Sequence, residues 1–330
     1  MRALQKLGRF AGRLVERRHP VILMYHRVAR VAHDPWQLAV WPERFAEQIE
    51  ALVQQRRVVP LRWLAAELAR GHVPGNVAAV TFDDGYSDVL VSAKPVLERY
   101  ACPATVFLVT GAIGESRAFW WDELSQIILE PPLLPAELEI EIAGCARRWR
   151  TGDPTGSAAG EIEDDAAIAR RRLHDEIWRL LRPLEPAPRS EALTRLGLWA
   201  GAGVEPGSPH RPLAVEEVRR LADPGFIDIG AHSVTHPALS LLSSAKQRAE
   251  IEGSRAACEE LIGEPIHTFA YPFGDFDDAA AACTRAAGFA CACTTEAAFV
   301  ARRNDPMRLP RLAVGNWAGA DFMRKLAGRL

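Results

Sequence analysis

The stretch VAAVTFDDGY, residues 77–86, decides how this chain folds. A strand-like apolar run ends there in two adjacent carboxylates, Asp83 and Asp84, followed by Gly85. A short apolar run rich in valine is typical of a buried strand. In α/β folds, reactive side chains collect at the carboxyl ends of parallel strands. A turn is the alternative interpretation of Asp-Asp-Gly alone, because Asp and Gly suit turn geometry.

A second apolar run, residues 226–231, ends in HSVTH, residues 232–236. His232 and His236 are four residues apart, so their imidazoles face the same way if the segment turns helically. Two imidazoles and one carboxylate are a common donor set for a catalytic divalent cation with open positions. The second carboxylate is then free to act as a base, which predicts metal-assisted hydrolysis. A solvated or capping pair is the alternative for the histidines alone.

Strand-like runs alternate with helical stretches along most of the chain. Buried strands that alternate with helices predict a parallel α/β sheet, and seven such strands suggest an incomplete barrel. The predicted strands are 21–28, 77–82, 104–110, 226–231, 267–271, 289–294 and 309–314. The predicted helices are 42–55, 61–70, 87–100, 214–222, 244–262 and 277–287.

The segment 115–211 breaks this alternation. It is rich in Pro, Gly, Glu and Arg, and it contains one clear predicted helix, 164–181. A long excursion of this kind is uncommon without a function, so we expect it to arch over the barrel mouth and to influence substrate choice. Trp120 and Trp121 near its start are interpreted as packing residues or, alternatively, as a stacking platform for sugar rings.

Composition and charge exclude several classes of function. The 330 residues are 48% hydrophobic and 25% charged, which is ordinary for a globular protein. The net charge of −2 implies no global attraction to nucleic acid, and no nucleic-acid partner is expected. The six cysteines suggest no disulfide framework, and no secretory signal is recognisable. These features predict a cytoplasmic protein.

Residues 1–20 combine an apolar stripe with opposing Lys and Arg side chains. A basic amphipathic helix can lie on an anionic membrane surface, which suggests peripheral contact with the inner membrane. A terminal helix docked on the domain with a solvated basic face is the alternative. The predicted organisation is a basic amphipathic N-terminal helix at 1–20, a barrel formed by 21–114 and 212–330, and an insertion at 115–211.

Three motifs together resemble a known family. TFDDG at 81–85, HSVTH at 232–236 and FAYPFG at 269–274 are similar, in order and separation, to the first three motifs of the polysaccharide deacetylases, also called the NodB-homology or carbohydrate esterase 4 family. The resemblance implies an irregular (β/α)7 barrel and a metal-dependent deacetylase that acts on an N-acetylated glycan. The implied cofactor is a divalent cation, Zn2+ by default from the donor set, with Co2+, Ni2+ or Mn2+ as alternatives.

The resemblance also implies roles for individual residues. Asp84, His232 and His236 would bind the metal, and Asp83 would be the general base. The backbone N–H of Phe273 would help to bind the oxyanion.

Two further residues are given roles, Tyr271 in substrate binding and Arg311 as a partner of the base carboxylate. Tyr271, in the same motif as Phe273, is predicted to contact substrate. Many family members carry an Arg where this chain has Ala270, and Arg311 is the candidate to reach the base carboxylate from another strand. An ordinary surface arginine is the alternative for Arg311.

The general acid is the second departure from the family pattern. Family members commonly end with a strand that carries a Leu-x-His signature, but no histidine follows His267 here. VILMYH at 21–26 resembles that strand moved to the front, and in a nearly closed barrel the first and last strands are neighbours. His26 is therefore the predicted acid, on the side of the metal opposite the base. A structural histidine bonded to backbone is the alternative.

Two other functions stay open at this point. The same site would serve a small non-sugar amide or formamide, because the chemistry requires only a planar amide. A catalytically inert glycan-binding protein is the alternative outside catalysis, suggested by Ala270 and by the missing C-terminal histidine.

Overall fold

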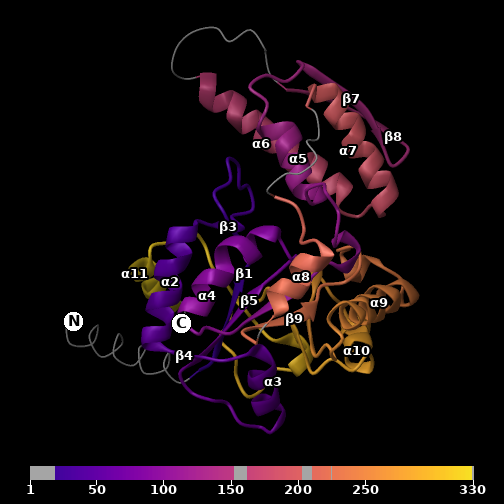
Figure 1. Cartoon of the computed structure of the whole chain (residues 1–330). Helices are drawn as coiled ribbons and strands as arrows, with labels where there is room; N and C mark the ends of the chain where they lie inside the picture. The colour runs from indigo at the N-terminus through magenta and orange to yellow at the C-terminus, as the bar shows by residue number, and fades with distance from the viewer. Residues whose placement is uncertain (1–18, 152–161, 203–209, 224, 329–330) are drawn as a thin grey trace, which may run out of the picture. The chain divides into compact units, whose positions relative to one another are not determined.

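The computed structural model describes residues 19–151, 162–202, 210–223 and 225–328 (Figure 1). It divides the chain into a first unit, residues 1–30, 37–114 and 213–330, and a second unit, residues 31–36 and 115–212. The predicted N-terminal amphipathic helix at 1–20 falls almost entirely outside the described residues. Within those ranges no helix is long and apolar enough to cross a membrane.

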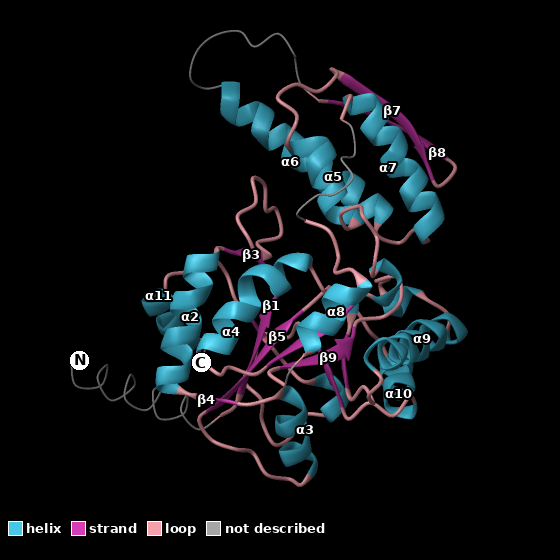
Figure 2. Ribbon diagram, in the orientation of Figure 1, coloured by secondary structure: helices cyan, strands magenta, loops and turns pink. Residues whose placement is uncertain are grey.

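The first unit is built on one curled, parallel sheet (Figure 2). Its described strands follow the order β11-β10-β9-β6-β5-β1-β12, and β4 (Arg57–Val58) pairs in addition with β5. The predicted incomplete (β/α) barrel is confirmed, and every strand of the sheet predicted from an apolar run, except β5, is shorter than that run. The strands are β1 (Val21–Tyr25), β5 (Val77–Phe82), β6 (Ala104–Leu108), β9 (Ile227–Ala231), β10 (Thr268–Ala270), β11 (Cys291–Cys293) and β12 (Leu312–Ala313).

The segment before β12 links the two ends of this sheet. Leu309 forms a parallel bridge with Cys293 of β11. The Leu309 N–H donates to the carbonyl of Ala292, and the Thr294 N–H donates to the carbonyl of Leu309. A few residues later, β12 pairs in parallel with β1. One short segment therefore pairs with β11 at one edge of the sheet and with β1 near the other, and the first strand of the chain lies beside the last.

Helices surround the sheet (Figure 2). In α2 (Pro42–Gln55), Phe45, Ile49 and Leu52 form the buried stripe expected of an amphipathic helix. Pro42 occupies the first turn, where its missing N–H costs nothing. The predicted helix at 87–100 is divided into a π-helical turn, Val89–Ala93, and α4 (Lys94–Arg99). The others are α3 (Leu61–Ala69), α8 (Val215–Ala222), α9 (Ser244–Ile262), α10 (Asp278–Ala286) and α11 (Gly319–Ala327).

Alternate side chains of the strands fill the barrel interior. Ile22, Ala79, Phe107, Ala270 and Cys293 belong to one buried cluster. Burying a large apolar side chain contributes about 1.5–3 kcal/mol, so this cluster fixes the strand ends that carry the polar residues.

The second unit has its own hydrophobic core. The prediction of a single clear helix was incomplete, because three helices and an antiparallel hairpin are present among its described residues. In the hairpin strand β7, Leu138, Ile140 and Ile142 are buried while the intervening glutamates are exposed. Its elements are α5 (Trp120–Leu129), β7 (Glu137–Ile142), β8 (Cys145–Arg150), α6 (Ile162–Leu181) and α7 (Pro186–Ala200).

A short loop of the N-terminal half also belongs to the second unit. It connects β2 (Arg27–Val28) and β3 (Ala39–Val40), which pair in parallel. Trp36 in this loop packs against His174 and Trp178 of α6, with ring centroids 5.9 and 4.7 Å apart. The loop thus shares the aromatic packing of the inserted segment.

Candidate metal and catalytic site

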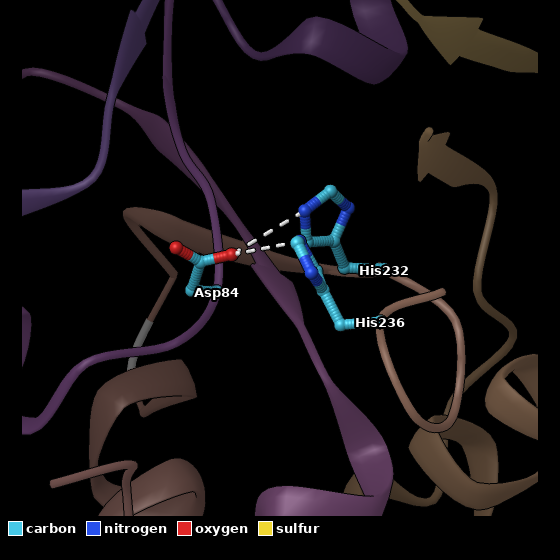
Figure 3. Close-up of side chains that lie close together, drawn as sticks. All are labelled: Asp84, His232 and His236. Atoms are coloured by element: carbon cyan, nitrogen blue, oxygen red, sulfur yellow. Dashed lines mark ion pairs between the residues drawn. The ribbon is translucent and has the colours of Figure 1, made fainter. Parts of the chain in front are cut away.

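Asp84, His232 and His236 converge at the carboxyl ends of β5 and β9 (Figure 3). The Nε2 atom of each histidine lies 3.4 Å from Oδ1 of Asp84, and all three side chains are buried. Ligand bonds of ~2.0–2.2 Å place the donors of one tetrahedral cation roughly 3.4 Å apart. The three residues, which we call the metal side, therefore fit a divalent cation.

Left-handed backbone brings these ligands together. Successive strand residues point to opposite faces, but Asp84 has φ of 73° and Gly85 has φ of 82°, which turns the chain directly after Asp83. The segment 232–236 does not form the helical turn that would have aligned the two imidazoles: it is irregular, and both Ser233 (φ 64°) and His236 (φ 56°) are left-handed. Each such non-glycine residue costs on the order of 1–3 kcal/mol, and such strain clusters at functional sites.

Hydrogen bonding and charge prepare the two histidines differently. Nδ1 of His232 lies 2.8 Å from the carbonyl of Ala270, which assigns its proton to Nδ1 and leaves Nε2 as the donor atom. Burial lowers the pKa of His232, but Asp84 and Asp83 raise it more, so the net pKa is raised. Burial dominates at His236 and lowers its pKa to about 4. His236 is therefore neutral near pH 7.

Asp84 remains ionised in this setting. Burial raises the pKa of its carboxyl, but hydrogen bonds from His232 and His236 lower it well below its ordinary value. The Asp84 carboxylate and the neutral His236 imidazole are already in the protonation states that cation binding requires. A cation would displace the proton that the raised pKa favours on His232.

Asp83 faces a different partner. Arg311 donates to both of its carboxylate oxygens, at 2.6 and 2.7 Å, and is completely buried. The guanidinium is held in turn by the Thr294 carbonyl at 3.0 Å and by the Thr81 hydroxyl at 3.1 Å. Burial raises the pKa of Asp83, but the charges of Arg311 and His232 lower it by more. The net pKa therefore lies below the ordinary value of an aspartate. Many family members carry an arginine at the position of Ala270. In this chain Arg311, in the segment that leads into β12, pairs with the carboxylate instead.

His26 directly follows β1 and is partly exposed. Its Nε2 atom lies 3.9 Å from Oδ2 of Asp83, so the expectation that it lies opposite the base is wrong. Asp83, Arg311 and His26 together are called the base side.

The sequence did not reveal a buried carboxylate, Asp88, that holds the segment directly after His26. Asp88 accepts hydrogen bonds from the Val28 N–H at 2.9 Å and from Nε–H of Arg27 at 3.1 Å.

Comparison with known proteins agrees with this geometry. The family model described as polysaccharide deacetylase matches residues 70–132 and 197–292, which contain both the Asp-Asp and the His-x-x-x-His motifs. The resemblance of this chain to the polysaccharide deacetylase family is therefore confirmed.

Relatives of known structure share the fold. The deacetylase PplD of Streptococcus pyogenes, solved in complex with acetate, matches with a TM-score of 0.59 and 16% identity, over 93% of this chain and 98% of that chain. IcaB from Ammonifex degensii matches with a TM-score of 0.57 and 19% identity, over 94% and 97%. At this identity the likeness concerns the fold alone.

A sequence relative covers less of the chain. YxkH of Bacillus subtilis (strain 168), whose name places it among the polysaccharide deacetylases, is 23% identical over 150 residues. The match covers 44% of this chain, and the chain spans about half of that relative, 52% of its length.

The third family motif, residues 269–274, begins in β10 and reaches the metal side. The ring of Phe273 packs edge-on against His236 with centroids 4.5 Å apart, and Phe273 is left-handed with φ of 58°. The oxyanion role of its N–H remains a prediction. The side chain of Tyr271 is fully buried and its hydroxyl donates to the Met307 carbonyl at 3.0 Å, which favours a structural role, and its contact with substrate stays a prediction. Burial raises the pKa of Tyr271 to about 12.

The tandem tryptophans pack within the second unit. Trp121 is buried and stacks on Phe119, with centroids 4.8 Å apart and planes inclined by 4°. Trp120 is half-buried and stacks on Trp178 at 6.1 Å. The packing interpretation is therefore favoured for both, and Trp121 has too little exposed surface to serve as a sugar platform.

Proposed function

We propose that this protein is a metal-dependent hydrolase that removes N-acetyl groups from an amino-sugar polysaccharide or a glycan intermediate. The observation that carries the proposal is that the metal side and the base side lie next to each other on the same rim of the barrel. The metal side offers two imidazoles and a carboxylate within 4.8 Å of one another. The base side, directly adjacent along the chain at Asp83, offers a second carboxylate that is fixed by Arg311.

The donor set suits Zn2+, and Co2+, Ni2+ or Mn2+ can use the same ligands. A bound cation would supply a Lewis acid that polarises the acetyl carbonyl and acidifies water. His232 and His236 present neutral nitrogen atoms to it, and Asp84 contributes the negative charge. Because three protein ligands converge among the residues that the structure describes, positions remain for water and substrate.

Asp83 is assigned the role of general base. Each carboxylate oxygen has two acceptor sites, so Asp83 can take a proton while it keeps both hydrogen bonds to Arg311. Its low pKa keeps it ionised at neutral pH, and a carboxylate of low basicity suffices when the water is acidified by a cation. Arg311 also prevents the carboxylate from turning toward the cation and becoming a fourth ligand.

His26 is assigned the role of general acid. It is the partly exposed side chain of the base side, so a leaving amine can approach it from solvent. Amide hydrolysis requires that the nitrogen gains a proton as the carbon–nitrogen bond breaks, and histidine titrates near neutrality. The Phe273 N–H is the candidate donor to the oxyanion, since backbone donors aimed at developing charge lower the barrier.

Acetate release from N-acetylated oligosaccharides tests this proposal. Purified protein should release acetate when Zn2+ is present and stop when a chelator removes the cation, with recovery on adding Zn2+ back. A parallel panel of small acetamides and formamides separates the glycan proposal from a small-amide hydrolase. Turnover of the small amides with no acetate from any glycan would contradict the proposed substrate class.

A further inference from the structure

The loop between the two histidine ligands is held from outside the site. Ser233, Val234 and Thr235 lie between His232 and His236, and this loop is neither helix nor strand. Ser233 in the loop and His236 directly after it are left-handed, so the backbone N–H groups of this segment cannot be satisfied by a regular ladder. The partners of those groups therefore decide whether the loop keeps the shape that presents His236.

Glu250 of α9 supplies these partners. Its Oε2 atom accepts the N–H groups of Val234 at 2.8 Å and Thr235 at 2.9 Å, and its Oε1 atom accepts the Thr235 hydroxyl at 2.7 Å. Hydrogen bonds to an ionised carboxylate are stronger than neutral ones. One carboxylate thus satisfies three donors of a loop that is three residues long.

The same face of α9 is shaped to receive the loop. Gly253 lies three residues after Glu250, on the same side of the helix. A Cβ atom at Gly253 would lie 3.2 Å from Cγ2 of Val234, so the glycine lets the loop pack closely. Glycine inside a helix is unfavourable. The close packing of Val234 against α9 explains why a glycine occupies position 253.

The three ligands differ in what supports them. Asp84 lies in the turn two residues after β5, and His232 follows β9 directly and is bonded to the Ala270 carbonyl. His236 has no strand next to it, and its own N–H is bonded within the loop, to the Ser233 hydroxyl at 3.0 Å. The position of His236 therefore depends most on the 233–235 loop, which is hydrogen-bonded to Glu250.

We propose that Glu250 is a positioning residue of the metal side, which sets cation affinity by holding the 233–235 loop. The inference rests on the proposed metal site but not on deacetylation. Supporting groups behind metal ligands usually change affinity by about 10–100-fold when they are removed. Glu250→Gln replaces acceptor oxygens facing three donors with one amide oxygen and an NH2, so we expect a loss of about that size.

Competition with a chromophoric chelator measures the Zn2+ affinity of the full-length protein and its variants. Glu250→Gln should bind Zn2+ about 10–100-fold more weakly, and Thr235→Val should lose about threefold or more, because it removes one of the three hydrogen bonds. Co2+ loading adds a direct view of the ligands, since the visible spectrum of Glu250→Gln should change as His236 shifts.

Glu259 provides a matched control on the same helix. Its carboxylate also holds a loop, because it accepts the Ile266 N–H at 3.1 Å and Nε of Arg255 at 2.9 Å, but that loop carries no ligand. Glu259→Gln should therefore keep Zn2+ affinity within about threefold of the parent. Thermal unfolding of the metal-free forms shows whether the two variants are destabilised alike.

The outcomes separate this inference from the proposed function. Unchanged Zn2+ affinity in Glu250→Gln, or equal losses in Glu250→Gln and Glu259→Gln, overturns the positioning role. If Glu250→Gln does not fold, Thr235→Val decides, and unchanged affinity there overturns it. A parent protein that binds Zn2+ but releases no acetate contradicts the proposed function and leaves the positioning role intact.

Discussion

The metal side and the base side are built by opposite means. On the metal side, Asp84 and His236 take left-handed backbone conformations, and the ligands meet because the chain is bent toward them. On the base side, the pair Asp83–Arg311 meets because one buried arginine spans from the segment before β12 to the end of β5. The first arrangement stores strain in the backbone, and the second depends on a charge partner. They should therefore fail differently when they are mutated.

The largest effect on the base side is expected from His26→Ala. Turnover should fall by about 10²–10⁴-fold, the usual contribution of a positioned acid, because the leaving amine loses its proton donor. Zn2+ content should stay unchanged, since His26 is no ligand. Acetate release and metal content measured on the same sample check both parts. Loss of the metal would instead assign His26 to ligation or support.

Arg311→Met is expected to affect stability strongly. It leaves Asp83 buried without its partner, and breaking a buried pair from one side costs about 3–5 kcal/mol. Chemical denaturation of parent and variant measures this difference. Asp228→Asn, which removes an Arg62 partner at the more exposed amino end of β9, is the control and should cost far less. Similar losses in both would contradict the special role of the buried pair.

The pH dependence of turnover sharpens the same contrast. In the parent, the pKa of Asp83 lies below its ordinary value, so the base is ionised throughout the neutral range. Without Arg311, burial raises that pKa, and protonation at higher pH should move the acidic limb of kcat/KM toward neutrality. Stability linked to Asp83 follows the same sign: in the parent it is present above the ordinary pKa and is lost as pH falls through the lowered one. An unmoved acidic limb in Arg311→Met would show that Asp83 does not govern it.

A smaller effect is expected from Ser233→Ala on the metal side. It removes one hydrogen bond, from the His236 N–H to the Ser233 hydroxyl, while the left-handed backbone remains. One such bond is worth ~0.5–1.5 kcal/mol, so Zn2+ affinity should fall by roughly 2–10-fold and turnover at saturating Zn2+ should hardly change. Chelator competition measures the first and acetate release the second. A larger loss than in Glu250→Gln would place the control of the loop in Ser233.

The barrel was predictable from the sequence because its strands are short apolar runs and helical stretches separate most of them. The hairpin of the second unit was missed although residues 137–142 alternate glutamate with Leu or Ile, a signal obscured by the Pro- and Gly-rich surroundings. The hydrophobic pattern determines which face of an element is buried, and this pattern was present in both regions.

The ligand set was readable from residue types, but the geometry that unites it was not. A spacing of four residues between His232 and His236 fits a helix, and the structure meets it with left-handed turns instead. Glu250 and Asp88 carry no sequence signature, because their partners include backbone N–H groups of loops that the sequence does not locate. Burial of Tyr271 and Trp121 likewise depends on tertiary packing.

The central claim is that two adjacent carboxylates, Asp83 and Asp84, do different work. Asp83→Asn and Asp84→Asn, compared side by side for Zn2+ content and acetate release, test it most directly. Asp83→Asn should keep stoichiometric Zn2+ and lose turnover by about 10²–10⁴-fold, whereas Asp84→Asn should lose the cation and turnover together. Full turnover in Asp83→Asn, or Zn2+ loss in Asp83→Asn with retention in Asp84→Asn, would contradict the division of roles.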